Sequence, residues 1–219
     1  MSKTESVSDT ALAALLARRS VSPRRLAQPG PGDDDIERML QVALRSPDHG
    51  GLRPWRVIEV ARGERAALAQ LFEDEKLRRE PAASALDRTR AREHATNPPV
   101  LLVFVVSPKA SSSARLSEQW LAAGAALGNL LNAAHLLGYG ACILSGERCA
   151  DEVLQRALGL RADESLAGFV SVGHIGEAPP TATRASPEEV WTRWSAPNSN
   201  ATDCERRTAP LTRTISGNV

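Results

Sequence analysis

The residues best suited to chemistry gather in one loop, within the segment at positions 43–60 (ALRSPDHGGLRPWRVIEV). Its basic side chains surround a Gly-Gly pair and are Arg45, His49, Arg53 and Arg56. Arginine binds anions through forked pairs of N–H groups, and the backbone amides of a glycine turn can add further donors. The loop therefore predicts a site for an anionic ligand. A plain connector with solvated arginines is the alternative that the loop alone leaves open.

A second candidate is Arg18-Arg19-Ser20, at the end of a predicted helix that Ser8 would cap and whose leucines share one face. Two arginines and a hydroxyl suit a phosphate group. The alternative is that the arginines only complement the helix dipole and are otherwise solvated.

A third candidate is the stretch after a long predicted helix at 116–137. Gly138-Tyr139-Gly140 ends this helix, a short strand follows at 141–144, and Ser145-Gly146 closes it. Such a strand end can present backbone N–H groups to a ligand, or it can be an ordinary turn. Within the helix, Gly124 and Gly128 are four residues apart, which predicts close packing against a twin helix in a dimer. A single buried helix in a monomer is the alternative.

The remaining elements must position these three candidates. Asp33-Asp34-Asp35 is predicted to supply the N-cap and a dipole-compatible charge for a helix with Ile36, Met39, Leu40 and Ala43 facing inward. Further helices are expected at 63–79, 84–95 and 151–158, and strands at 55–60, 100–106 and 166–175. Seven consecutive apolar residues at 100–106 indicate a strand buried on both faces. His94 lies in a charged run and is predicted to be a surface residue. This order of elements predicts an α+β protein with three layers.

Composition narrows the classes of function that the chain can have. With 219 residues, 42% of them hydrophobic and 24% charged, the chain has an ordinary globular composition. A net charge of +1 and 4% aromatic residues give no support for a nucleic-acid or membrane partner. The first residues lack the apolar core of a targeting signal, and three cysteines without ligand-type spacing indicate reduced thiols in a cytoplasmic protein. We see no metal motif, and no GxGxxG turn of a Rossmann domain.

Together these segments resemble the nitroreductase family of flavin enzymes, specifically its short YdjA-like type. The resemblance rests on Arg18-Arg19-Ser20, on the 43–60 segment, on Trp120 at the long helix, on Gly138-Tyr139-Gly140 with Ser145-Gly146, and on the strand end and close at 168–179 (GFVSVGHIGEAP) and 186–194 (SPEEVWTRW). These motifs occur in the family's order and cover about residues 9 to 195. The resemblance implies a single domain at 8–195, followed by a tail at 196–219 that is expected to be disordered.

The family implies a three-layer α-β-α fold with a mixed, mainly antiparallel sheet, and an obligate homodimer with FMN at its interface. Carried over by position, one chain would hold FMN through Arg18, Arg19, Ser20, Ile143, Leu144 and Ser145, and its partner would add Arg45 and His49. A stretch for the nicotinamide nucleotide would be Ala133, Ala134, His135, Leu136, Leu137 and Gly138. Trp55 is expected to anchor the loop to the sheet.

The implied activity is hydride transfer from NAD(P)H to nitroaromatic, quinone or similar acceptors in a ping-pong scheme. The flavin N5 would carry the chemistry, so no catalytic side chain and no metal is expected. Two positions depart from the family's pattern, because Ile143 replaces the usual Trp and Leu144 replaces the usual Arg. The loss of this positive charge could be offset by Arg53 of the loop. The alternatives are therefore a flavin-binding protein with little turnover, and a scaffold protein that uses its tail. The acceptor and the choice between NADH and NADPH stay open.

Overall fold

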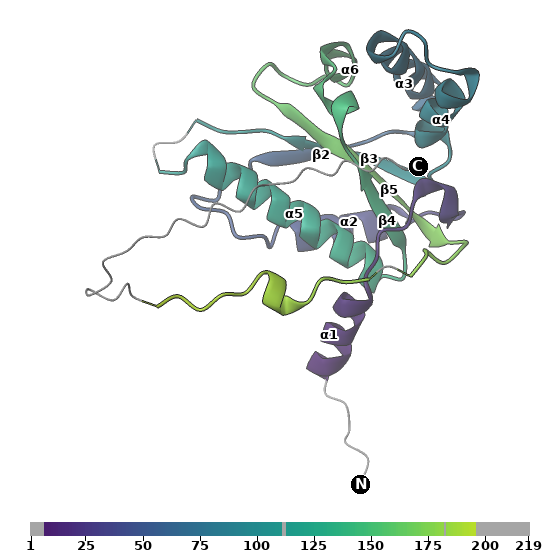
Figure 1. Ribbon diagram of the computed structural model, residues 1–219. Coiled ribbons are helices and arrows are strands. Elements are labelled where there is room, and N and C mark those ends of the chain that lie inside the picture. The colour runs from purple at the N-terminus through teal and green to yellow at the C-terminus, as the bar shows by residue number, and fades with distance from the viewer. Residues whose placement is uncertain (1–6, 111–112, 182, 196–219) are drawn as a thin grey trace, which may run out of the picture. The chain divides into compact units, whose positions relative to one another are not determined.

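The computed structural model describes residues 7–110, 113–181 and 183–195. The chain divides into two compact units, one ending at Pro180 and one beginning at Thr181. The first unit holds the helices and strands shown in Figure 1: α1 (Val7–Ala17), β1 (Leu26–Ala27), α2 (Asp33–Ala43), β2 (Trp55–Glu59), α3 (Arg65–Arg79), α4 (Ala85–Thr96), β3 (Val100–Val106), α5 (Leu116–Leu136), β4 (Gly140–Leu144), α6 (Glu152–Ala157) and β5 (Ser165–Ile175). Short 3₁₀ turns include η1 (Pro23–Arg25) and η3 (Glu147–Ala150).

The sheet is mainly antiparallel, as the sequence predicted. β3 pairs with β2 on one side and with β5 on the other, β4 pairs with the far edge of β5, and β1 pairs with the last two residues of β5. One parallel bridge joins Ser20 to Ala141, which makes the pairing mixed. The sheet therefore ends at β4, with the segment after α1 lying beside it.

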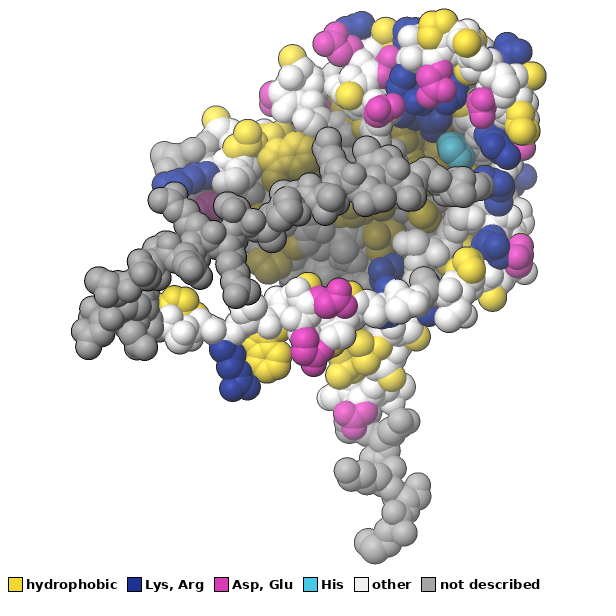
Figure 2. Space-filling model, in the orientation of Figure 1, with side chains coloured by type: hydrophobic (Ala, Val, Ile, Leu, Met, Phe, Trp, Pro, Cys, Tyr) yellow, Lys and Arg dark blue, Asp and Glu magenta, His cyan; other side chains and the backbone are white. Residues whose placement is uncertain are grey.

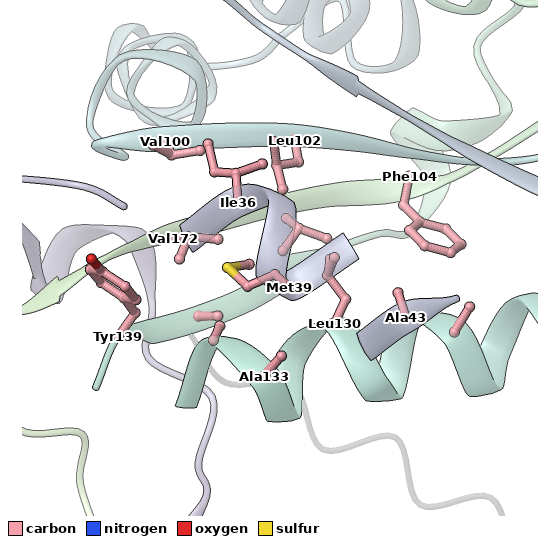
Figure 3. Close-up of a cluster of buried hydrophobic side chains, with 14 of the residues drawn as sticks. Ile36, Met39, Ala43, Val100, Leu102, Phe104, Leu130, Ala133, Tyr139 and Val172 are labelled. Atoms are coloured by element: carbon pink, nitrogen blue, oxygen red, sulfur yellow. The ribbon is translucent and has the colours of Figure 1, made fainter. Parts of the chain in front are cut away.

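Helices cover both faces of this sheet and produce two separate cores. Because side chains alternate across a strand, Val100, Leu102 and Phe104 of β3 face α2 and α5, whereas Leu101 and Val103 face α3 and α4. Figure 3 shows the first core, where side chains from the sheet meet those of α2 and α5. The three-layer α+β arrangement is confirmed.

Most helix ends lie close to their predicted positions, but two predicted caps are wrong. α1 already includes Ser8, so this residue lies within the helix rather than before it. The N-cap of α2 is Gly32, without a side-chain cap, and the three aspartates occupy the first turn, where their charge complements the helix dipole. Ser84, in contrast, caps α4 in a capping box with Asp87.

The second unit contains a 3₁₀ turn at Pro187–Glu189, begun by a capping box at Ser186. The Arg193 guanidinium lies 5.3 Å from the centre of the Trp191 ring. The expected domain limits at 8–195 stay a prediction, and the expected tail at 196–219 lies outside the described residues. No helix among the described residues is both long and apolar enough to span a membrane.

Candidate functional site

The first and third candidate segments meet at the β4 edge of the sheet. Ser20 forms a bridge with Ala141, and the Val21 amide donates to the Ala141 carbonyl at 3.0 Å. This contact holds the segment that follows α1 against β4, whose last residues are Ile143 and Leu144. The structure therefore brings Arg18-Arg19-Ser20 and the 143–145 strand end to one side of the molecule, although they are more than 120 positions apart in the sequence.

A cavity of about 490 Å³ opens beside this edge, between η1, the end of α4 and the end of β4. Its lining is rich in charged side chains and consists of Ser22, Pro23, Arg24, Arg25, Arg90, Glu93, His94, Asn97, Leu144 and Glu177. We call it the basic pocket. Figure 2 shows Lys and Arg side chains gathered on this side of the molecule. Leu144, where the resemblance implied the loss of an arginine, therefore shares this lining with three arginines from other elements.

The charges of the basic pocket are unbalanced. Arg25 forms an ion pair with Glu177. Arg24 and Arg90 form no hydrogen bond or ion pair within the described part of the chain, which leaves Glu93 as the opposing charge in the lining. Guanidinium groups are donors only, so the pocket favours the electron-rich edge or the anionic group of a ligand. Arg53, which was expected to be able to offset the missing cation at Leu144, does not line this pocket in the same chain.

The prediction that His94 is a surface residue is wrong. It is half-buried, lines the basic pocket, and its Nδ1 lies 3.2 Å from Nη1 of Arg148. Burial, and then the charges of Arg148 and Arg24, lower the pKa of His94. The sequence held one signal for this position, since Arg90 and His94 are four residues apart and so share a helix face.

The basic loop within positions 43–60 lies elsewhere, with His49 at the start of α5. The His49 Nδ1 is 3.3 Å from the Glu118 carboxylate, in the first turn of that helix. The Asp48 carboxylate accepts from the Arg53 amide at 2.6 Å and holds the turn, in which Arg53 itself has a positive φ of 47°. Arg45 and His49 are both exposed. These two residues are therefore available to a ligand or to another chain.

Two further residues of this loop have structural roles. Trp55 stacks on Phe104 with ring centres 5.7 Å apart, which confirms that it anchors the loop to the sheet. Arg56 donates to both carboxylate oxygens of Glu164, at 2.7 and 2.8 Å. Arg56 is thus engaged within the fold, and the loop offers fewer free cations than its sequence indicated.

The two groups of predicted site residues lie near opposite ends of α5. At the end of α5, His135 Nε2 contacts the Ala14 carbonyl at 2.8 Å, which places the end of α1 and Arg18 there. His49 lies at the other end, and a helix of 21 residues spans about 30 Å. One chain therefore does not bring His49 to the Arg18–Ser20 edge.

The stretch expected to contact the nicotinamide nucleotide mainly serves packing. Ala133 and Ala134 are buried in the core between α5 and the sheet. His135 is half-buried, and its ring contacts the Ala14 carbonyl of α1. A histidine near a helix end is expected to be satisfied in this way. Leu136 and Gly138 are exposed and remain open to a ligand. The assignment of this stretch to a nucleotide stays a prediction.

The chain belongs to the Nitroreductase family, whose model matches residues 15–174. Among its relatives is the Escherichia coli (strain K12) protein named "Putative NAD(P)H nitroreductase YdjA", which is 28% identical over 163 residues, or 74% of this chain and 87% of the relative.

Solved structures share the fold. A nitroreductase-like family protein from Bacillus cereus superposes with a TM-score of 0.70 at 18% identity, over 90% of this chain and all of that one. A Desulfovibrio desulfuricans protein in complex with FMN gives 0.66 at 23% identity, over 89% and 100%. The NADPH:FMN oxidoreductase of Vibrio harveyi, complexed with NAD+, gives 0.66 at 17% identity, over 87% and 79%.

Proposed function

We propose that this protein is a cytoplasmic, FMN-dependent oxidoreductase that passes hydride from NAD(P)H to nitroaromatic, quinone or similar acceptors. The observation that carries the proposal is the edge site itself, where Arg18-Arg19-Ser20 is held against β4 beside a pocket with unpaired arginines. Family membership and the relatives' names support the choice of chemistry, since they describe an NAD(P)H nitroreductase, a complex with FMN and an NADPH:FMN oxidoreductase.

The residues present suit FMN. Arg18, Arg19 and Ser20 offer the forked N–H groups and the hydroxyl that bind a phosphate. Leu144 offers an apolar side chain to a planar ring, and Arg24 and Arg90 offer donors to its carbonyl edge, while Ile143 packs against the core between the sheet and α5. Bound FMN would supply the hydride-accepting and hydride-donating chemistry, and these side chains would bind it, orient it and stabilise negative charge.

We further propose that the functional unit is a homodimer in which Arg45 and His49 reach the partner's flavin. Two observations support it. Both residues are exposed, and His49 lies far from the edge site of its own chain. Large apolar side chains that are at least 40% exposed also lie on the helices α1, α2 and α5 and at the residue that follows α2, and include Leu12, Leu16, Val42, Leu44, Trp120, Leu121 and Leu136. Exposed apolar surface of this extent is typical of an interaction site.

Steady-state kinetics would separate turnover from mere flavin binding. We expect NADPH or NADH oxidation to accelerate with a nitroaromatic or quinone acceptor, and double-reciprocal plots at several acceptor concentrations to give parallel lines, as a ping-pong scheme requires. A protein that binds FMN but accelerates no nicotinamide oxidation would instead support the flavin-binding alternative that Leu144 suggests.

Arg18→Ala is expected to weaken FMN binding about 10- to 100-fold, because a charge-assisted hydrogen bond to phosphate contributes about 1.5–3 kcal/mol. Fluorescence titration of the flavin-free protein would measure the dissociation constant, and size-exclusion chromatography should show an intact dimer. The matched control is Arg38→Ala, which removes an exposed arginine that pairs with Asp35 on α2. Equal FMN affinity in Arg18→Ala, Arg38→Ala and the unmodified protein would refute the role of Arg18.

A further inference from the structure

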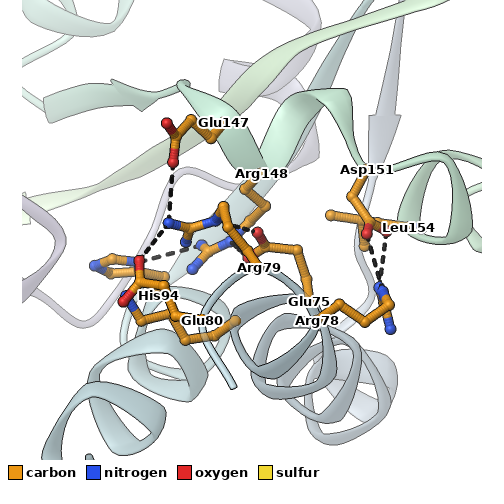
Figure 4. Close-up of polar contacts among 10 residues, drawn as sticks. Glu75, Arg78, Arg79, Glu80, His94, Glu147, Arg148, Asp151 and Leu154 are labelled. Carbon is orange, nitrogen blue, oxygen red and sulfur yellow. Dashed lines mark hydrogen bonds and ion pairs between the residues drawn. The ribbon is translucent and has the colours of Figure 1, made fainter. Parts of the chain in front are cut away.

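A row of buried charges leads from the interior to the basic pocket. Glu75 on α3 is only 1% exposed, and its carboxylate pairs with Arg79 Nε at 2.7 Å and with Arg148 Nε at 3.2 Å. The Arg148 guanidinium lies 4.2 Å from the centre of the Phe72 ring. Figure 4 shows Arg148 between Glu75 and His94. Glu75 and Phe72 therefore hold the Arg148 cation in one place.

The contact between Arg148 and His94 determines where the imidazole proton lies. A guanidinium group can only donate, so the His94 Nδ1 that faces it at 3.2 Å must accept. A neutral ring then carries its proton on Nε2. The Nε2–H edge lies on the other side of the ring from the nitrogen that faces Arg148, and His94 lines the basic pocket whereas Arg148 does not.

Protonation of His94 would place a second donor against Arg148, so the contact also keeps the ring neutral. On balance, the charged groups around His94 also favour its neutral form. Arg148 approaches from η3, with Glu75 of α3 behind it, and Arg24 approaches from η1, while Arg90 and Glu93 lie on α4 and Glu177 lies across the pocket. Burial and the two nearest arginines lower the pKa of His94, against the opposing effect of Glu93.

We propose that Arg148 is a positioning residue that fixes His94 as a neutral Nε2–H donor to the electron-rich edge of the ligand in the basic pocket. The inference rests on the proposed function in one respect, since the ligand edge would be a carbonyl of the FMN ring. Because the donor is neutral, its hydrogen bond is expected to persist at pH values where an ordinary histidine, with a pKa near ~6.5, becomes charged.

Nitrogen NMR on the flavin-free full chain tests the tautomer directly. We expect His94 to show the Nε2–H form and to resist protonation, and the Arg148→Met variant to show mixed tautomers and an ordinary titration. Arg148→Lys, which keeps a donor, should restore part of the original behaviour. The matched control is Arg79→Met, which also removes a partner of Glu75 but has no contact with His94. An Nδ1–H tautomer in the unmodified protein, or equal shifts in Arg79→Met and Arg148→Met, would overturn the proposal.

FMN titration tests the donor role. His94→Phe is expected to weaken FMN binding about tenfold, the effect of one lost hydrogen bond, and His94→Gln, which keeps an N–H donor, should recover most of it. FMN binding by His94→Phe as tight as that of the unmodified protein would overturn the donor role. Because the NMR measurement needs no flavin, a chain that binds no FMN at all would refute the proposed function while the tautomer is still decided.

Discussion

Gly124→Leu is expected to convert the proposed dimer to a monomer and to abolish tight FMN binding. Gly124 is exposed on α5, and a side chain there would meet no other atom of its own chain within 4 Å. The variant should therefore fold. In a symmetric dimer that packs α5 against its twin, the added side chain clashes twice, and each clash costs about 1–3 kcal/mol. The dimer dissociation constant should then rise about 30-fold or more.

Light scattering after size-exclusion chromatography would measure the mass, and the visible spectrum of the same fractions would report FMN. Ala67→Leu is the matched control, because it adds a comparable side chain at an exposed position on α3, on the opposite face of the sheet. It should remain a dimer with full FMN. A Gly124→Leu protein that stays dimeric and yellow would show that the interface does not run along this part of α5.

Glu164→Gln is expected to lower the free energy of unfolding by about 2–3 kcal/mol at pH 7. The Glu164 side chain is fully inaccessible and binds Arg56, the Arg161 amide at 2.9 Å and the Arg161 guanidinium at 3.0 Å. The variant leaves these donors without the carboxylate they surround, and breaking such a pair is costly. Arg56 is 34% exposed, so solvent screening keeps the loss in the lower part of the range.

The same pair predicts how stability depends on pH. The hydrogen bond from Arg56 lowers the pKa of Glu164 to about 2, from 4.5. A carboxyl group with a lowered pKa stabilises the fold fully above its unfolded value, and this contribution is lost as the pH falls from 4.5 toward 2. Urea unfolding at pH 7, 5 and 3 should therefore show a gap in the free energy of unfolding between Glu164→Gln and the unmodified protein. This gap should narrow at pH 3.

The neighbouring Asp163 provides the control for this experiment. Its side chain is 60% exposed and pairs with Arg161 at 3.3 Å on the surface, so Asp163→Asn should change stability by less than about 1 kcal/mol. A gap for Glu164→Gln that is as wide at pH 3 as at pH 7, or equal losses in the two variants, would contradict the role given to the buried carboxylate.

Much of the fold follows from local signals. Seven apolar residues after a Pro-Pro pair place β3 at Val100–Val106, as predicted, because a strand covered on both faces needs no polar alternation. The long helix, predicted at 116–137, ends one residue earlier, at Leu136. In contrast, β1 at Leu26–Ala27 lies in a Pro- and Gly-rich stretch and becomes a strand only by pairing with Ile175 and His174, about 150 positions later. Such long-range pairing has no local signature.

The site residues also divide into those that the sequence signalled and those that it did not. Arg18-Arg19-Ser20 and the 143–145 strand end were recognisable as motifs, and the structure places both at one edge. Arg24 and His94 were not, because Arg24 lies in a Pro- and Gly-rich loop and His94 in a charged run that resembles a solvated surface, and they share a pocket only in the folded chain. Arg56 was counted with the ligand-binding loop, but its partner Glu164 is 108 residues away in the sequence.

The proposed chemistry is tested most directly by the visible absorption spectrum of the purified full-length protein, recorded without oxygen before and after NADPH or NADH is added. We predict a yellow protein with a flavin band that bleaches on addition of the reduced nucleotide and returns when a quinone or nitroaromatic acceptor is supplied. A colourless protein that takes up no added FMN would contradict the account, and so would a bound flavin that neither nucleotide reduces.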